Sequence, residues 1–258
     1  MVEFKKANIK MASQNASNIV FRKDYTAPDH QIESIDLSFD LIPTCTEVTS
    51  KIIAVPQEDR KSDDLILDGD DLTLVSIKIA GEDSFPGQYD MRPGKLIIHN
   101  IKERTEIEIV TRINPRNNLE LSGLYMSKNN YITQCEAEGF RRITYFPDRP
   151  DILAKYRVVI RAPKDYKVLL SNGNLIEQGE LLDGRNYAIW EDPFPKPSYL
   201  FALVAGNFVA QEQKVTLSDG REALLQIWTE PSNKGKTEFA MQSLVKAIKK
   251  NVSAWIST

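Results

Sequence analysis

Hydrophobic and polar residues alternate one by one along several stretches of the chain. In the clearest stretch every second residue is apolar and the residues between are serine or aspartate; the apolar ones are Ile35, Leu37, Phe39 and Leu41. Successive side chains of a strand point to opposite faces, so this pattern predicts a half-buried β-strand. Weaker alternation, separated by turn-forming residues, recurs at 48–55, 72–79, 96–101, 107–113 and 156–160. We therefore expect a mainly β protein, a large twisted β-sandwich or saddle-shaped pair of sheets.

Two neighbouring segments of the second half predict contrasting structures. Residues 192–197 contain three prolines, at positions 193, 195 and 197. Proline cannot donate to a strand ladder, so we expect a rigid extended connection here, outside any central strand. The apolar run at 199–209 that follows predicts a strand buried on both faces.

The end of the chain predicts a β-hairpin followed by the only convincing helix. Alternating residues flank the turn at 218–220, which gives the hairpin. Apolar residues then recur at three- and four-residue steps, as in an amphipathic helix; they are Met241, Leu244, Val245, Ile248, Val252 and Trp255. We expect this stripe to face a core that a segment beyond residue 258 would complete. The expected division is a flexible tail (1–20), a β domain (21–208) and a separate segment (209–258).

Composition narrows the class of protein. The chain has 258 residues, 41% hydrophobic and 27% charged, and a net charge of -3. These values are ordinary for a soluble globular protein and give no electrostatic reason to expect nucleic acid or membrane as a partner. No run approaches the roughly 20 apolar residues of a membrane helix. Cys45 and Cys135 are too few for a disulfide framework, and without a secretory signal we expect a cytoplasmic protein.

The sequence contains none of the common catalytic motifs. The two histidines, His30 and His99, do not begin an HExxH motif, and neither has a second histidine at metal-ligand spacing. The sequence also lacks a GxSxG elbow, a GxxxxGK[ST] phosphate loop and a GxGxxG turn. We therefore predict no catalytic residue and no metal ligand in this chain.

One polar segment, at 134–142, stands apart from the others. In an extended chain Gln134, Glu136 and Glu138 share one face. A carboxylate beside an amide oxygen suits a ligand ammonium group, because the first supplies charge and the second an oriented acceptor. Alternatively, Glu136 and Glu138 simply pair with Arg141 and Arg142. The residues alone leave both interpretations open.

The same segment carries a family resemblance. QCEAEGFRRITYFPDRPD at 134–151, LSNGN at 170–174 and DPFPKPSYLFALVAGNF at 192–208 resemble the N-terminal domain of the aminopeptidase N (alanyl aminopeptidase) family of zinc metallopeptidases. DYTAPD at 24–29 and GLY at 123–125 are similar to its bacterial branch. The resemblance implies a large twisted β domain that caps the active site. It also implies that Gln134 and Glu136 bind the free α-amino group of the peptide substrate.

The resemblance has a limit, because the family's GxMEN loop and HExxH helix are absent. Residues 209–258 are similar only to the opening segment of a thermolysin-like catalytic domain. We therefore expect an amino-terminal fragment of an enzyme that removes N-terminal amino acids from peptides, inactive alone. Zinc would belong to the complete enzyme, and the partners would be peptide N-termini and the missing catalytic segment. The alternatives are a standalone β-sandwich interaction module and an enzyme assembled with a separately encoded catalytic chain.

Overall fold

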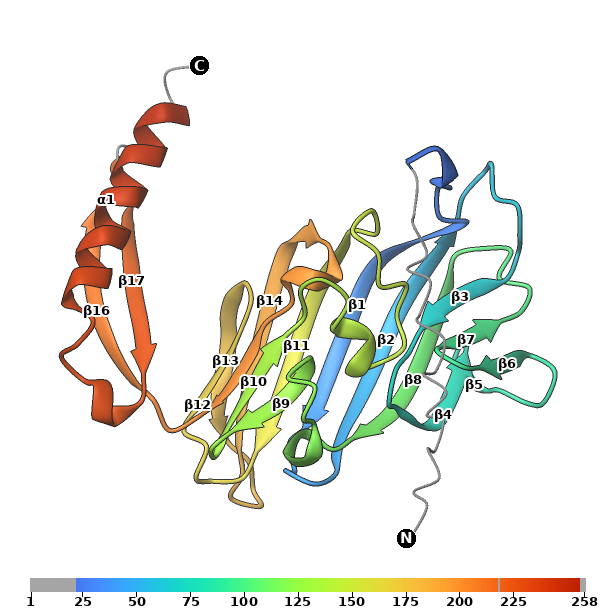
Figure 1. Cartoon of the computed structure of the whole chain (residues 1–258), viewed down its shortest axis with the longest axis horizontal. Helices are drawn as coiled ribbons and strands as arrows, with labels where there is room; N and C mark the ends of the chain where they lie inside the picture. The colour runs from blue at the N-terminus through green and yellow to red at the C-terminus, as the bar shows by residue number, and fades with distance from the viewer. Residues whose placement is uncertain (1–21, 218, 256–258) are drawn as a thin grey trace, which may run out of the picture.

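The largest element of the fold is an eight-stranded, mainly antiparallel sheet (Figure 1). The computed structural model describes residues 22–217 and 219–255, with side chains as far as Lys249. The strand order of the sheet is β13 (Asn174–Glu180), β14 (Asn186–Lys196), β11 (Ala154–Ala162), β1 (His30–Asp40), β2 (Thr46–Pro56), β8 (Thr105–Ile113), β4 (Thr73–Ile79) and β5 (Glu82–Asp83). Its one parallel pair among the described residues joins β1 to β11, which are more than 100 residues apart in the chain.

Two smaller sheets accompany the large one. The four-stranded sheet has the order β12 (Val168–Ser171), β15 (Leu203–Gly206), β10 (Asn130–Gln134) and β9 (Gly123–Ser127). The three-stranded sheet has the order β3 (Leu65–Asp68), β7 (Lys95–Ile98) and β6 (Tyr89–Arg92). Single turns of 3-10 helix lie outside the strands, at η1 (Arg22–Asp24), η2 (Pro115–Asn117), η3 (Phe140–Arg142), η4 (Ser198–Leu200) and η5 (Pro231–Asn233). The prediction of a mainly β fold is confirmed.

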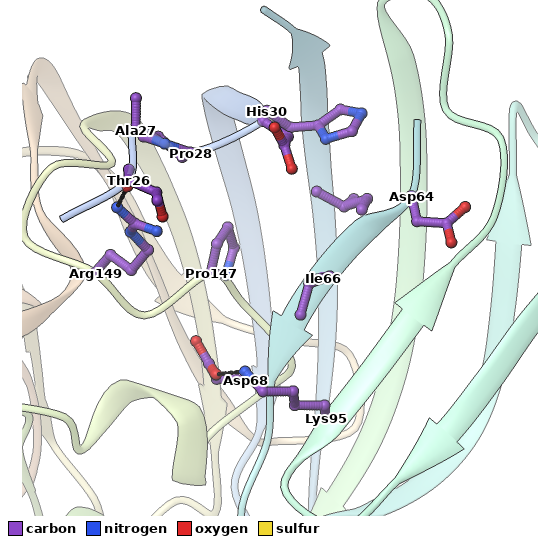
Figure 2. Close-up of a pocket in the computed structure, with 12 residues that line it drawn as sticks. Thr26, Ala27, Pro28, His30, Asp64, Ile66, Asp68, Lys95, Pro147 and Arg149 are labelled. Atoms are coloured by element: carbon purple, nitrogen blue, oxygen red, sulfur yellow. Dashed lines mark hydrogen bonds and ion pairs between the residues drawn. The ribbon is translucent and has the colours of Figure 1, made fainter. Parts of the chain in front are cut away.

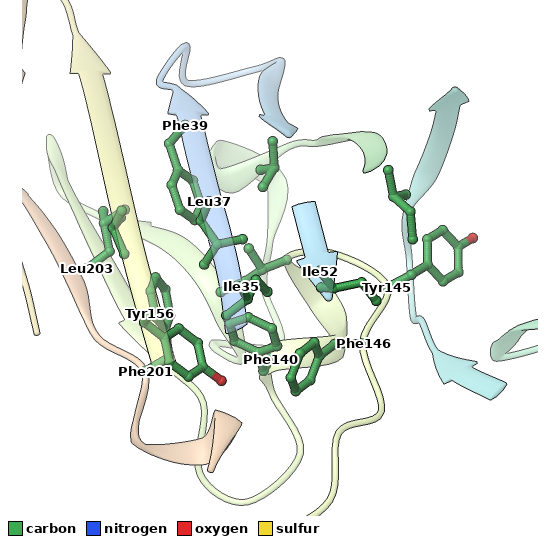
Figure 3. Close-up of a cluster of buried hydrophobic side chains, with 14 of the residues drawn as sticks. Ile35, Leu37, Phe39, Ile52, Phe140, Tyr145, Phe146, Tyr156, Phe201 and Leu203 are labelled. Carbon is green, nitrogen blue, oxygen red and sulfur yellow. The ribbon is translucent and has the colours of Figure 1, made fainter. Parts of the chain in front are cut away.

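The main hydrophobic core unites the sheets. The alternating apolar residues of β1 and Leu41 directly after it are all buried, as their pattern predicts. Buried residues of the four-stranded sheet join the same core. Phe140 lies at its centre, with ring centroids 5.1 Å from Phe146 and 5.3 Å from Phe201 (Figure 3). The core therefore depends on residues that are distant in the sequence.

The secondary structure of residues 192–197 and 199–209 differs from the prediction. Strand β14 continues through Lys196, so residues 192–196 are not a connection outside the sheet. Pairing with β13 ends at Glu191, and pairing with β11 is irregular over this stretch. The missing N–H groups of Pro193 and Pro195 therefore interrupt no regular ladder. The following strand β15 is also shorter than predicted, because η4 occupies the start of the apolar run.

The end of the chain forms a small unit of its own, which we call the hairpin–helix unit. It consists of β16 (Val209–Thr216), β17 (Glu222–Thr229) and α1 (Glu238–Trp255), and it lies at one end of the molecule (Figure 1). Met241 is fully buried against Val215 and Leu225, and other residues of the helix stripe pack beside them; these are Leu244, Val245 and Ile248. The hairpin therefore covers this part of the stripe, which we had expected to lack a partner.

Some predictions fall outside the residues that the structure describes. They are the tail at 1–20 and the side chains of Val252 and Trp255. The division of the chain at residues 208 and 209 stays a prediction. No helix of the described residues is long and apolar enough to cross a membrane.

Candidate functional site

The candidate site is a tight turn that follows strand β10. Gln134 is the last residue of β10 and pairs with Gly123 of β9. The chain then turns, and the Gly139 N–H donates a hydrogen bond to the Cys135 carbonyl at 2.8 Å. The prediction that extended chain continues through Glu138 is therefore wrong. Residues 135–139 form what we call the amine turn, and the peptide bond between Glu136 and Ala137 is cis.

Two glycines allow the amine turn to pack closely against its surroundings. A Cβ on Gly139 would lie 2.4 Å from the Gln134 carbonyl oxygen, which no side chain tolerates. Gly123 adopts φ +74°, and a Cβ there would lie 2.8 Å from the Cβ of Arg142. Strand β9, the amine turn and η3 therefore form a compact assembly in which larger residues would not fit.

Buried residues anchor the amine turn at both ends. Cys135 is buried at its start, and Phe140 is buried in the aromatic cluster directly after it. Burial raises the pKa of the Cys135 thiol, so the thiol stays protonated at neutral pH. Between these anchors Glu136, Ala137 and Glu138 are exposed, as is Gln134 just before them. The turn thus presents a polar surface on a rigid base.

The two glutamates differ in the structure, because only Glu138 has an arginine partner. Glu138 lies 3.3 Å from the Arg141 guanidinium, as the pairing interpretation expects. Arg142 pairs instead with Asp70 and Asp71. The Glu136 carboxylate has no ion-pair or hydrogen-bond partner among residues 22–217 and 219–249. Glu136 is therefore the glutamate that is free to bind a ligand.

Gln134 lies next to Glu136. Its side-chain nitrogen donates to the Glu136 carbonyl oxygen at 3.3 Å, which ties the amide to the turn. The amide oxygen of Gln134 has no donor within the described part of the chain. An amide oxygen and a carboxylate are both acceptors, and an ammonium group carries three donors. The pair can therefore receive a cationic amine.

A hollow of about 380 Å³ lies beside the amine turn. Glu138, Arg141 and Arg142 line it on the side of the turn, and Glu120 and Ser122 line it from the preceding loop. Most of its charged groups are already paired with one another. Neither Gln134 nor Glu136 lines this hollow, so it forms no part of the proposed acceptor pair.

A separate pocket of about 240 Å³ shares no lining residue with the amine turn (Figure 2). Lys95 pairs with Asp68 at 2.9 Å, and Arg149 donates to the Thr26 carbonyl oxygen at 2.8 Å. Arg149 also pairs with Asp151, which holds the pKa of that carboxyl below its usual range. The charged groups of this pocket therefore hold the structure together, and we assign no ligand to it.

The residues present do not fit a zinc site. No three His, Cys, Asp or Glu side chains converge to hold a metal ion in the part of the chain that the structure describes. The His30 ring lies 2.9 Å from the Ile101 carbonyl oxygen. The His99 ring lies between Asp64 and Asp90, at 3.1 and 3.5 Å. We therefore assign no zinc ligand among the residues that the structure describes.

Sequence reasoning missed the group beneath the turn. Asp148 is buried, and its carboxylate accepts hydrogen bonds from the backbone N–H and the Nε of Arg141, both at 3.1 Å. The Ser198 hydroxyl donates to the other carboxylate oxygen. Asp148 and Ser198 are 50 residues apart, and neither belongs to a periodic pattern that would have singled it out.

Comparison with known proteins identifies the family to which the chain is similar. The model of the peptidase M1 N-terminal domain matches residues 27–200. Aminopeptidase N of Escherichia coli is 46% identical over 230 residues, and that of Caulobacter vibrioides is 43% identical over 226 residues. These alignments cover 89% and 88% of this chain but only 26% of each relative, so the chain spans about a quarter of their length.

Solved structures agree with the sequence relatives. Aminopeptidase A of Legionella pneumophila, solved with aspartic acid, superposes with a TM-score of 0.83 at 39% identity, over 87% of this chain and 27% of that one. An M1 zinc metallopeptidase of Deinococcus radiodurans, solved with a Tyr-Ser-Ala substrate, superposes with a TM-score of 0.66 at 14% identity. The second likeness covers 79% of this chain and 48% of that one, and it concerns the fold alone.

Proposed function

The chain belongs to the peptidase M1 family through its N-terminal domain, and from that premise we propose that the amine turn binds the α-ammonium group of peptide substrates. The enzyme would be an aminopeptidase, as the names of the relatives state for those proteins. The observation that carries the proposal is the unpaired state of two adjacent acceptors. The Glu136 carboxylate and the Gln134 amide oxygen belong to exposed residues two positions apart in the chain, and neither group has a partner among the described residues.

The chemistry of an ammonium group matches these acceptors. A carboxylate that accepts from an ammonium forms a charge-assisted hydrogen bond, which contributes about 1.5–3 kcal/mol. Gln134 adds an oriented acceptor, because its nitrogen is already held by the Glu136 carbonyl. An N-acylated peptide offers neither the charge nor the three donors. The site would therefore select peptides with a free amino terminus.

Binding at this position would also determine which bond reacts. If Glu136 holds the terminal ammonium, the substrate is fixed at its first residue, and only the first peptide bond can lie at a set distance from the turn. The rigid base of the turn, with Cys135 and Phe140 buried, supports this role. Catalytic zinc in such an enzyme would be bound by residues other than those described here.

A chimeric enzyme tests the proposal. This chain would replace the corresponding first quarter of Escherichia coli aminopeptidase N, and hydrolysis of an alanyl anilide would be measured. We expect Glu136→Ala to lower kcat/KM by at least about tenfold, since about 1.4 kcal/mol is a factor of ten. Glu136→Gln should retain part of the binding and lose the preference for a charged amine.

Two controls keep the interpretation specific. Glu120→Gln removes an exposed carboxylate that lines the neighbouring hollow and lies outside the amine turn, so it should change kcat/KM by less than about twofold. The melting temperature should not fall in the Glu136 variants, because that carboxylate has no partner to lose. Normal kcat/KM in a correctly folded Glu136→Ala chimera would contradict the proposed role.

A further inference from the structure

A buried carboxylate lies under the amine turn. Asp148 is the one buried acidic residue among the described residues, and its side chain is only 1% exposed. Burial of a carboxylate is costly unless charged and hydrogen-bonding partners satisfy it. Both oxygens of Asp148 are satisfied, one by Arg141 and the other by the Ser198 hydroxyl. The group is therefore built into the structure with specific partners.

Arg141 contacts Asp148 at three points. Its backbone N–H and its Nε donate to one carboxylate oxygen at 3.1 Å, and a terminal guanidinium nitrogen donates to the Asp148 carbonyl oxygen at 3.1 Å. A terminal nitrogen also lies 3.3 Å from Glu138 in the amine turn. The guanidinium group thus bridges a buried carboxylate below and the turn above. A planar guanidinium can make all these contacts at once, whereas an ammonium group cannot.

Further bonds fix this pair to two other parts of the fold. The Asp148 N–H donates to the Asp68 carboxylate at 3.1 Å, at the end of β3. The Asp70 N–H donates to the Arg141 carbonyl oxygen at 3.0 Å. Ser198, which completes Asp148, begins η4. Segments at Asp70 and Asp148 therefore bond Arg141 directly, two residues after the amine turn ends, and Ser198 from a third segment holds its partner Asp148.

We propose that Asp148, acting through Arg141, is a positioning residue for the amine turn. The pair fixes the direction in which the chain leaves the turn, and so it fixes where Gln134 and Glu136 present their acceptors. What the turn binds rests on the proposed function above. That Asp148 and Arg141 hold the turn is a separate claim and can fail separately.

Hydrogen–deuterium exchange of the 258-residue chain tests this claim. The Gly139 N–H closes the amine turn on Cys135, so its exchange rate reports how often the turn opens. In Asp148→Asn we expect Gly139 to exchange at least tenfold faster, while amides of β1 keep their wild-type rates. Arg141→Lys keeps the positive charge but loses the planar guanidinium group, so Gly139 should exchange faster in this variant too. It is also the second variant if Asp148→Asn does not fold.

A matched control is available close by. Asp151 forms an ion pair with Arg149 at 2.6 Å in a more exposed position, and that pair has no bond to the amine turn. Asp151→Asn should leave the exchange of Gly139 unchanged. Faster exchange throughout the protein in Asp148→Asn would indicate a general loss of stability and would overturn the positioning role. Unchanged exchange of Gly139 in the folded variant would overturn it as well.

Binding of a simple amine separates positioning from the proposed function. Alanine amide and N-acetylalanine amide would be titrated into wild type and variants, with the Gln134 side-chain amide observed by nuclear magnetic resonance. We expect alanine amide to bind at least fivefold more weakly to Asp148→Asn. Raised exchange of Gly139 with unaltered alanine amide affinity would overturn the proposal. If wild type does not prefer alanine amide over its acetylated analogue, the proposed function fails, and the exchange rates still decide the role of Asp148.

Discussion

The main β region and the hairpin–helix unit reach their buried states by different routes. In the main region a single core joins strands that lie far apart in the chain, and Phe39, Phe140 and Phe201 meet within it. In the hairpin–helix unit the described residues bury three apolar side chains, and all come from elements that are close in the chain; they are Val215, Leu225 and Met241. The two regions are linked by an exposed ion pair between Lys128 and Glu230 at 2.8 Å.

This difference shows where a rigid functional turn can be built. A side chain held by partners from several distant segments cannot move unless the whole core moves. The amine turn is attached to such a core through Phe140 and Asp148. The hairpin–helix unit buries little apolar surface, and exposed ion pairs such as Lys128–Glu230 contribute about 0–1 kcal/mol. We therefore expect the two regions to unfold separately.

The largest effect should come from Phe140→Ala. This substitution removes the ring at the centre of the aromatic cluster, and loss of a buried phenylalanine costs about 3–5 kcal/mol. Urea unfolding followed by tryptophan fluorescence would measure the change. Phe239→Ala is the control, because that ring is 82% exposed and its loss should cost less than about 0.5 kcal/mol. A loss below 1 kcal/mol for Phe140→Ala would contradict the central place of this residue.

A smaller and local effect is expected from Met241→Ala. Met241 is fully buried in the hairpin–helix unit, and its truncation should cost about 2 kcal/mol within that unit. Limited proteolysis should then cleave after residue 209 more rapidly, while the urea midpoint of the main region stays unchanged. Equal destabilisation of both regions would show that they unfold together and would contradict the expected separate unfolding.

The smallest effect concerns alkaline pH. Burial raises the pKa of the Cys135 thiol, so above the ordinary thiol pKa of about 8.5 the unfolded chain releases a proton that the folded chain retains. The resulting stability is fully present below about pH 8.5 and is lost as pH rises, by about 1.4 kcal/mol between pH 7 and 9.5. No titratable residue of the hairpin–helix unit is buried within 209–217 and 219–249, so the loss should fall on the main region.

Two cysteine variants isolate this contribution. Cys135→Ala should flatten the decrease in melting temperature between pH 7 and 9.5, whatever its effect at neutral pH. Cys45→Ala should leave the decrease unchanged, because that residue is exposed. An identical pH dependence in wild type and Cys135→Ala would show that the buried thiol contributes nothing to it.

Local patterns in the sequence were sufficient for much of the fold. Alternation identified β1 because its buried face points into one core, and three- and four-residue spacing identified α1. The pattern failed around Pro193 and Pro195, because the effect of a proline depends on whether a neighbouring strand needs its N–H group. Tertiary pairing decides which strand lies beside β14, and here that strand is β13.

In the candidate site, too, some features follow from the sequence and others depend on tertiary contacts. Residue types and spacing singled out Gln134, Glu136 and Glu138 as candidates, and the family resemblance favoured Gln134 and Glu136 among them. The sequence did not determine that Glu138 pairs with Arg141 while Glu136 stays free, because this depends on the turn that the chain makes after Gln134. Only the tertiary structure brings Asp148 and Ser198 beneath the turn from 50 residues apart. The physical reason is that spacing along the chain fixes local geometry, whereas the partners of a buried charge come from segments that meet only when the core forms.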